Sequence, residues 1–139
     1  MNRKKYFISS IGAGLASYVV DFLTHVVVLG NEYKEHQSLF AGMDKMMKWI
    51  WLNPFAYFVP SFILGYVFIK GYEGRGVAEG VRFGILMGLL MEVPRFCFMT
   101  MYYDFPMVFD GVSLIAGLIK WVLVGILFAV LYKPVGKTN

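Results

Sequence analysis

The chain has 139 residues, of which 58% are hydrophobic and 16% are charged, and its formal net charge is +4. Soluble domains average about 45–50% apolar and about 25% charged residues, so a small soluble globule is excluded, and so is a disordered chain. Cys97 is the only cysteine, which excludes a disulfide scaffold and a cysteine-based zinc site. The composition indicates an integral membrane protein.

Four apolar windows are long enough to cross a bilayer as helices, which takes about 20 residues each. They cover residues 6–29, 49–69, 81–103 and 111–132. None of them alternates apolar and polar residues with a period of two, as the strands of a membrane barrel do. We therefore expect one all-α transmembrane domain over residues 1–139, an integral membrane four-helix bundle.

The segment between the first two windows, residues 31–48, is polar but carries apolar residues at three- and four-residue steps. These are Leu39, Phe40, Met43, Met46 and Met47. The spacing predicts an amphipathic helix lying in the outer interface, too short and too polar to span the bilayer. A plain extracellular loop is the alternative.

The distribution of lysine and arginine predicts the orientation. One side would carry Arg3, Lys4, Lys5, Lys70, Arg75, Arg82, Lys133 and Lys137, and the other Lys34, Lys45 and Lys48 together with Glu32, Glu35, Asp44, Asp104 and Asp110. Eight cations against three place both termini in the cytoplasm. The positive net charge then reflects membrane orientation, and the expected partner is the lipid bilayer and not nucleic acid.

A stripe of small residues runs along the third window. Gly76, Gly80, Gly84 and Gly88 recur at exact four-residue steps, so they share one face of a helix. Small residues allow close approach of helices in lipid. The stripe predicts a packing face, either inside this bundle or in a homo-oligomer. A weaker series in the fourth window contains Gly117, Gly125 and Ala129.

Ionisable residues within membrane spans are costly and mark functional sites by default. Five occur here, namely Asp21, His25, Glu92, Arg95 and Lys120. Counted from the outer ends of their windows at about 1.5 Å per residue, all but His25 lie roughly 12–16 Å deep. We expect them to form one buried cluster, with the Tyr57 hydroxyl at the same level. His25 would lie one turn above Asp21 on the same face.

Several roles fit such a cluster. It can fix the register of the helices, relay protons through Asp21 and His25, or line a pocket for a polar ligand or a lipid head group. A metal site there is disfavoured because Arg95 and Lys120 would repel a cation. Glu32, Glu35 and His36 offer a second, weak metal option at the outer surface, where a solvated polar face is the preferred interpretation. We predict no metal and no cofactor.

The chain contains no zinc-protease, nucleophile-elbow or P-loop motif, so no enzymatic activity is expected. The stretch KGYEGRGVAEGVRFGILMGLLMEVP, residues 70–94, resembles a segment of small uncharacterised four-helix bacterial membrane proteins that form a domain-of-unknown-function family. The resemblance implies a protein of the bacterial inner membrane and implies no activity.

The glycine stripe, the small extramembrane mass and the lack of catalytic motifs together favour an accessory or scaffold subunit of a larger membrane assembly. A small transporter or channel-like protein that moves protons or a small polar solute through the charged layer is the first alternative. A membrane protein that binds a lipid or a small ligand is the second.

Overall fold

The computed structural model describes residues 2–132, and this part of the chain is helical with no strand. The helices are α1 (Arg3–Phe22), a π-helical turn (Leu23–Val28), α2 (Gly30–Glu35), α3 (Met43–Trp49), α4 (Asn53–Lys70), α5 (Val77–Tyr102) and α6 (Met107–Leu131), with short 3₁₀ turns at Gln37–Leu39 and Ile50–Leu52. Four stretches are long and apolar enough to span a membrane: Arg3–Val28, Met43–Lys70, Val77–Tyr102 and Met107–Leu131.

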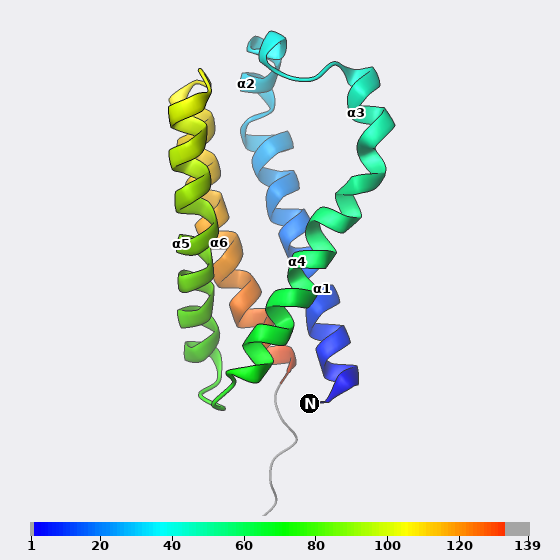
Figure 1. Cartoon of the computed structure of the whole chain (residues 1–139), viewed down its shortest axis with the longest axis vertical. Helices are drawn as coiled ribbons and strands as arrows, with labels where there is room; N and C mark the ends of the chain where they lie inside the picture. The colour runs from blue at the N-terminus through cyan, green and yellow to red at the C-terminus, as the bar shows by residue number, and fades with distance from the viewer. Residues whose placement is uncertain (1, 133–139) are drawn as a thin grey trace, which may run out of the picture.

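The spanning helices pack in the order α5, α6, α1, α4, and α5 runs alongside α6 over its whole length (Figure 1). The start of α1 and the end of α6 lie together at one end of the molecule, where the Asn2 amide donates to the Tyr132 hydroxyl at 3.3 Å. We call this the terminal end. The opposite end, which carries α2 and α3, is the loop end.

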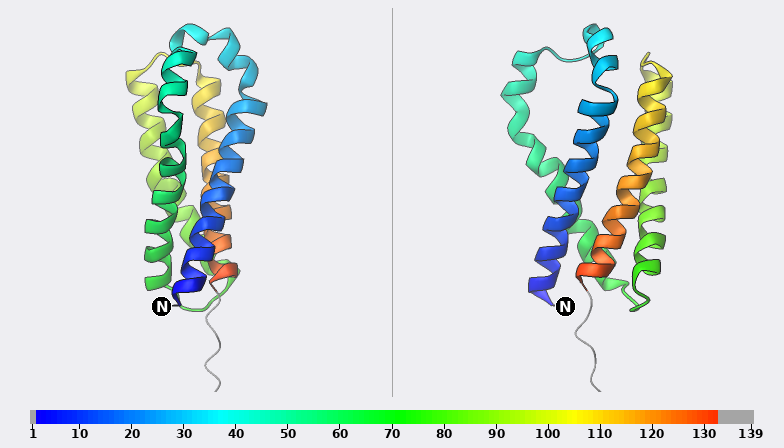
Figure 2. Two further views of the ribbon diagram at one scale, coloured as in Figure 1. Left: turned by 90° about the vertical axis from the view of Figure 1, so that its right-hand side faces the viewer. Right: turned by 180° about the vertical axis from the view of Figure 1, so that it is seen from behind.

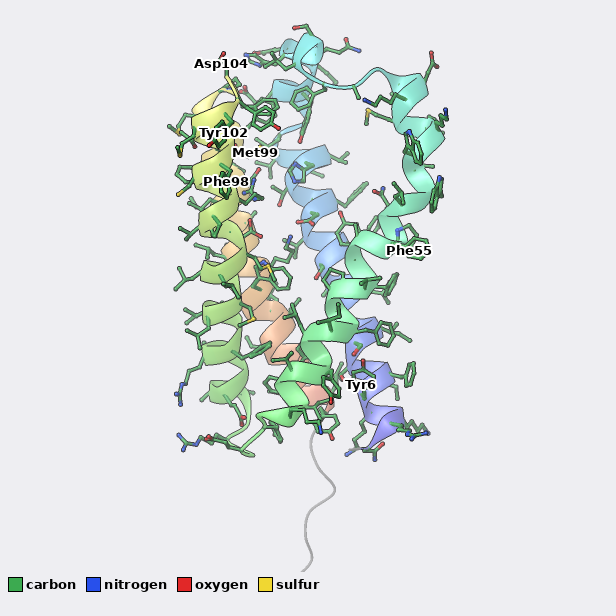
Figure 3. The ribbon with its side chains drawn as sticks, viewed as in Figure 1. Tyr6, Phe55, Phe98, Met99, Tyr102 and Asp104 are labelled. Atoms are coloured by element: carbon green, nitrogen blue, oxygen red, sulfur yellow. The ribbon has the colours of Figure 1, made fainter. Side chains whose placement is uncertain are left out.

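An apolar cluster joins all four spanning helices in the half of the molecule nearest the terminal end. It is built from Ala13, Leu64, Phe68, Val124, Phe128 and Ala129, with Phe83 packed against it. The ring of Phe68 lies 5.1 Å from that of Phe83 and 5.7 Å from that of Phe128. Tyr6, labelled in Figure 3, ties α1 to α4 here, because its hydroxyl donates to the Phe62 carbonyl at 2.9 Å.

Toward the loop end, α4 and α3 diverge from the other helices, as Figure 1 and the right view of Figure 2 show. The chain continues from α3 through a 3₁₀ turn into α4, so α3 extends the second span. The four helices therefore form a tight group at the terminal end and an open one at the loop end.

Residues 31–48 do not form the single helix expected from their periodicity. They divide between α2, a 3₁₀ turn and the start of α3. The helix breaks where Phe40 adopts an extended backbone, with φ −110° and ψ 160°. Its ring packs 4.6 Å from Tyr33, 5.4 Å from Phe105 and 5.5 Å from Phe109. The break in the helix therefore coincides with an aromatic cluster at the loop end.

Three of the four glycines in the predicted stripe lie against α6. A Cβ on Gly80 or Gly84 would overlap the backbone of Gly125 or of Trp121, and one on Gly88 would lie 3.2 Å from the Leu118 side chain. This close approach is possible because these α5 positions lack a side chain.

Gly76 was expected to belong to the same stripe, and that prediction is wrong. Gly76 precedes α5 as its N-cap, and nothing lies within 4 Å of a Cβ built there. Its φ of +70° is the reason for glycine at this position, since other residues rarely adopt it. Glu79, in the first turn of α5, accepts hydrogen bonds from the Glu73 and Arg75 amides at 2.7 and 2.9 Å and so fixes the loop that enters the helix.

Candidate functional site

A chain of ion pairs joins charged residues of three helices, α1, α5 and α6. Lys120 on α6 donates from Nζ to both carboxylate oxygens of Asp21 on α1, at 3.0 and 3.1 Å. The same Nζ lies 3.9 Å from Oε1 of Glu92 on α5. Each side chain is less than one-fifth exposed. Lys120 therefore bridges two carboxylates from different helices.

Glu92 is the most deeply buried member of this group. Its Oε2 accepts from Arg95 Nε at 2.8 Å, and its Oε1 accepts from Trp121 Nε1 at 3.0 Å. The carboxylate lies over Gly117 of α6, where a Cβ would come within 2.6 Å of Oε1. Gly117 thus leaves space for the Glu92 carboxylate. The sequence pattern had indicated only that Gly117 belongs to a series of small residues that pack against another helix.

Arg95 uses only part of its guanidinium for this pairing. Its Nε donates to Glu92, whereas its Nη2 atom is buried and has no hydrogen-bond partner among the residues that the structure describes. A buried donor without a partner is unfavourable, so this atom indicates a site for an acceptor that is not part of residues 2–132.

The ion pairs line a cavity of about 180 Å³, which we call the charged cavity. Its lining residues are Asp21, His25, Glu92, Arg95, Ser113 and Lys120. Asp21 and Lys120 also line a side cavity of about 250 Å³ that reaches α4, where Tyr57 and Ser61 face it. Tyr57 interacts electrostatically with Asp21 across this space. The five ionisable residues singled out in the sequence thus surround one polar space, with Tyr57 beside it.

His25 lines the charged cavity together with Asp21 and also hydrogen-bonds the Tyr33 hydroxyl through Nδ1 at 2.9 Å. It lies in the π-helical turn, in which the Leu29 amide bonds the Thr24 carbonyl and the Thr24 hydroxyl donates to the Val20 carbonyl at 2.8 Å. His25 therefore connects Asp21 in the charged cavity with Tyr33 of α2.

A second polar space, which we call the loop-end cavity, lies beside the charged cavity and has a volume of about 210 Å³. Its polar lining residues are His25, Tyr33, Arg95, Asp110 and Ser113, and its apolar ones are Phe40, Met99, Phe105 and Phe109. Met99, labelled in Figure 3, comes from α5 near the loop end. The two cavities share His25, Arg95 and Ser113, so they adjoin.

Asp110 was counted among the charged residues outside the four apolar windows, and the structure places it inside α6. It is 5% exposed, lies in the first turn of α6 and forms no ion pair with any residue from 2 to 132. The apolar window used to predict the fourth span began at residue 111, so this acid was excluded by one position. Pro106 followed by an acid within the first turn is a helix-start signal that would have moved the boundary.

A larger vestibule of about 780 Å³ opens at the loop end, between the end of the first span and the start of α3. It shares His25, Tyr33 and Phe40 with the loop-end cavity. A series of adjoining spaces thus leads from the loop end to the ion pairs. In the other direction, the apolar cluster around Phe128 lies between the ion pairs and the terminal end.

The three residues considered as a metal site at the outer surface, Glu32, Glu35 and His36, lie close together in the structure. Ligand atoms of Glu32, Glu35 and His36 lie within 4.8 Å of one another. His36 Nδ1 is 3.1 Å from the Glu32 carbonyl oxygen and 3.9 Å from Glu32 Oε2. These partly exposed side chains could together ligate a cation, but hydrogen bonds and ion pairing within the group account for the arrangement.

Comparison with family models, with curated proteins and with solved structures found no match for this chain.

Proposed function

We propose that this chain is a multi-pass protein of a bacterial inner membrane, with its terminal end in the cytoplasm and its loop end outside. Four helices long and apolar enough to span a bilayer support this proposal. Lysine and arginine concentrate at the terminal end, whereas the loop end has three lysines.

The segment around α2 and α3 would then lie at the outer interface. Met43, Met46 and Met47 are each more than half exposed and would contact lipid head groups and the ends of acyl chains. Trp49 and Trp51, about half exposed, stand where aromatic residues anchor a span at the interface.

Within this frame, we propose that the protein binds a small polar solute that enters from the loop end and reaches the charged cavity. The observation that carries the proposal is the charged cavity itself, lined from three helices by two carboxylates, a lysine, an arginine, a histidine and a serine. Polar groups around a space inside a membrane protein are tolerated when water or a polar ligand occupies that space. The adjoining loop-end cavity and vestibule provide the route.

A binding site is favoured over an open pore. Below the ion pairs, α1 and α6 carry Ala13, Val124 and Phe128 of the apolar cluster, which has no ionisable member. Movement of the solute or of protons across the membrane would require the helices to rearrange. The role of accessory subunit stays a prediction. A subunit of this kind could function with all of these cavities free of water. The proposal involves no covalent chemistry.

Cysteine accessibility tests the proposal. Ser113, which lines both the charged and the loop-end cavity, is changed to cysteine in a Cys97→Ser background. The matched control is Ile115→Cys, two residues further along α6 and 61% exposed on the apolar surface of the molecule. Both variants are reconstituted in lipid nanodiscs and treated with a membrane-impermeant, thiol-specific methanethiosulfonate.

The cysteine at position 113 should react much faster than the one at position 115, because only a hydrated thiol ionises to the reactive thiolate. Equal, slow rates at the two positions would overturn the proposal, since lipid, a partner helix or collapsed packing would then fill the cavities. Retained thermal stability of both variants checks that each protein is folded.

A further inference from the structure

We infer that the solute is a small zwitterion, with its anionic group bound to Arg95 and its cationic group bound to Asp110 in the loop-end cavity. This inference rests on the proposed function and specifies the class of solute. The observation behind it is that Arg95 and Asp110, which carry opposite charges, both line the loop-end cavity but do not form an ion pair with each other.

Arg95 supplies the anion site. Its Nε is occupied by Glu92, and its buried Nη2 still has a hydrogen to donate. A guanidinium binds carboxylate and phosphate oxygens through charge-assisted hydrogen bonds, which are stronger than those between neutral groups. An oxygen of a bound anion would satisfy the one buried donor that the protein leaves unpaired at this site.

Asp110 supplies the cation site. It is 5% exposed and forms no ion pair within residues 2–132. It lies in the first turn of α6, where the positive end of the helix dipole attracts a negative charge. A buried carboxylate is nevertheless costly without a cationic partner, and an ammonium group of the solute would provide one.

The rest of the lining agrees with a solute of this kind. Tyr33, Phe40, Phe105 and Phe109 surround the cavity with aromatic faces, which attract an ammonium group. The Ser113 and Tyr33 hydroxyls add donors and acceptors. A volume of about 210 Å³ is below the range of about 300–1,000 Å³ that is common for drug-sized ligands, so the solute is small.

Solutes with one charge fit less well. A lone anion on Arg95 would be repelled by Asp110, and Glu92 lies close by. A lone cation at Asp110 would be repelled by Arg95, with Lys120 in the adjoining charged cavity. The charges on the two sides of the site therefore select for a molecule that carries both signs. Two sources share this chemistry: a free amino-acid-like zwitterion and the ethanolamine phosphate head group of a lipid.

Protection of the cysteine at position 113 tests the inference and distinguishes the sources. In phosphatidylglycerol nanodiscs, the labelling rate is measured with L-alanine, L-serine, glycine betaine or O-phosphoethanolamine, and with acetate and ethylammonium as singly charged controls. At about ten times its dissociation constant, a zwitterion that fills the site should slow labelling about elevenfold. Acetate and ethylammonium at equal concentration should leave the rate unchanged. A parallel set of nanodiscs contains phosphatidylethanolamine, and protection only in that set identifies the lipid head group as the source.

Two variants assign the charges, each with a matched control. Asp110→Asn should abolish protection by the zwitterion and allow acetate to protect, whereas Asp104→Asn, an exposed acid in the preceding loop, should behave as the parent protein. Arg95→Lys should weaken protection because it keeps the charge but loses Nη2, whereas Arg82→Lys, exposed on the same helix, should not.

The outcomes separate the two proposals. If the cysteine at position 113 reacts rapidly but neither a zwitterion nor phosphatidylethanolamine slows it, the solute class is wrong while the hydrated cavity stands. If it does not react, the proposed function fails as well. Isothermal titration of the unmodified protein with the same compounds provides a second measurement that does not depend on the cysteine variant. Absence of heat for every zwitterion, together with no protection in the phosphatidylethanolamine nanodiscs, would overturn the inference.

Discussion

Gly117 of α6 faces the Glu92 carboxylate of α5 so closely that a Cβ on Gly117 would lie 2.6 Å from Glu92 Oε1. The carboxylate occupies the volume that a side chain would fill. The position of this charge therefore depends on a glycine of the neighbouring helix as much as on its hydrogen-bond partners, Arg95 and Trp121.

The first prediction follows from this contact. Gly117→Ala should displace Glu92 and destabilise the protein by about 1–3 kcal/mol, the usual cost of overpacking. Gly111→Ala is the control, because Gly111 lies on the same helix and has nothing within 4 Å of an added Cβ. This control should be neutral or stabilising by about 0.5–1 kcal/mol, since alanine favours a helix. Thermal unfolding in detergent compares the two, and equal effects would contradict the packing described for Gly117.

The ion pair between Asp21 and Lys120 leads to the second prediction. Lys120→Met removes the only ion-pair partner that Asp21 has within residues 2–132 and should cost about 3–5 kcal/mol, because a buried charge is left uncompensated. Adding Asp21→Asn should recover much of that loss. Lys45→Met, at an exposed lysine, is the control. A double-mutant cycle measures the coupling, and purely additive effects would show that the two side chains do not interact.

The third prediction concerns the interface between α5 and α6. Gly84→Ala should force the two helices apart, because its Cβ would overlap the backbone of Trp121 and Val122. The expected loss of about 1–3 kcal/mol contrasts with Gly30→Ala, whose Cβ would meet nothing within 4 Å. Reversible unfolding of each variant gives the difference, and an unchanged Gly84→Ala protein would argue against direct contact of the helices there.

The fourth prediction concerns pH. Burial raises the pKa of the Tyr33 hydroxyl above its ordinary value of 10.0. The unfolded chain then loses this proton at lower pH than the folded one, so the stability linked to Tyr33 is complete below pH 10.0 and decreases as the pH rises through the folded-state pKa.

Tyr33→Phe should remove this alkaline decrease. It should also destabilise the protein by about 0.5–1.5 kcal/mol at neutral pH, through loss of the hydrogen bond to His25. Tyr102→Phe, at a tyrosine that is 69% exposed, is the control. Unfolding measured between neutral and alkaline pH checks both effects, and an identical pH profile in Tyr33→Phe would contradict the assignment.

The sequence was sufficient to predict four helices long and apolar enough to span a membrane, and to predict that the charged residues within them lie together. Asp21, Glu92 and Lys120 stand in three separate apolar windows, and counting residues at a constant rise placed them at one level. The pairing follows from the physical need of each buried charge for an opposite one.

Other features depend on packing that a linear pattern does not encode. The π-helical turn that contains His25 has no sequence signature. The periodic segment is interrupted at Phe40, whose ring packs against Tyr33 of the same segment and against Phe105 and Phe109. Gly76 has the spacing of the glycine stripe, but its positive φ shows that it belongs to the loop before α5 and not to the helix face. Asp110 was missed because the fourth apolar window began at residue 111, whereas α6 already begins at Met107.

The most direct test of the charged cavity as a solute site is sided labelling of Ser113→Cys in sealed proteoliposomes of known orientation. Reagent added at the loop end should modify this cysteine rapidly, while the same reagent confined to the terminal end should not. The Ile115→Cys control should stay unreactive from both sides. Rapid labelling from the terminal end, or no labelling from either, would contradict entry from the loop end into a charged layer closed below by apolar packing.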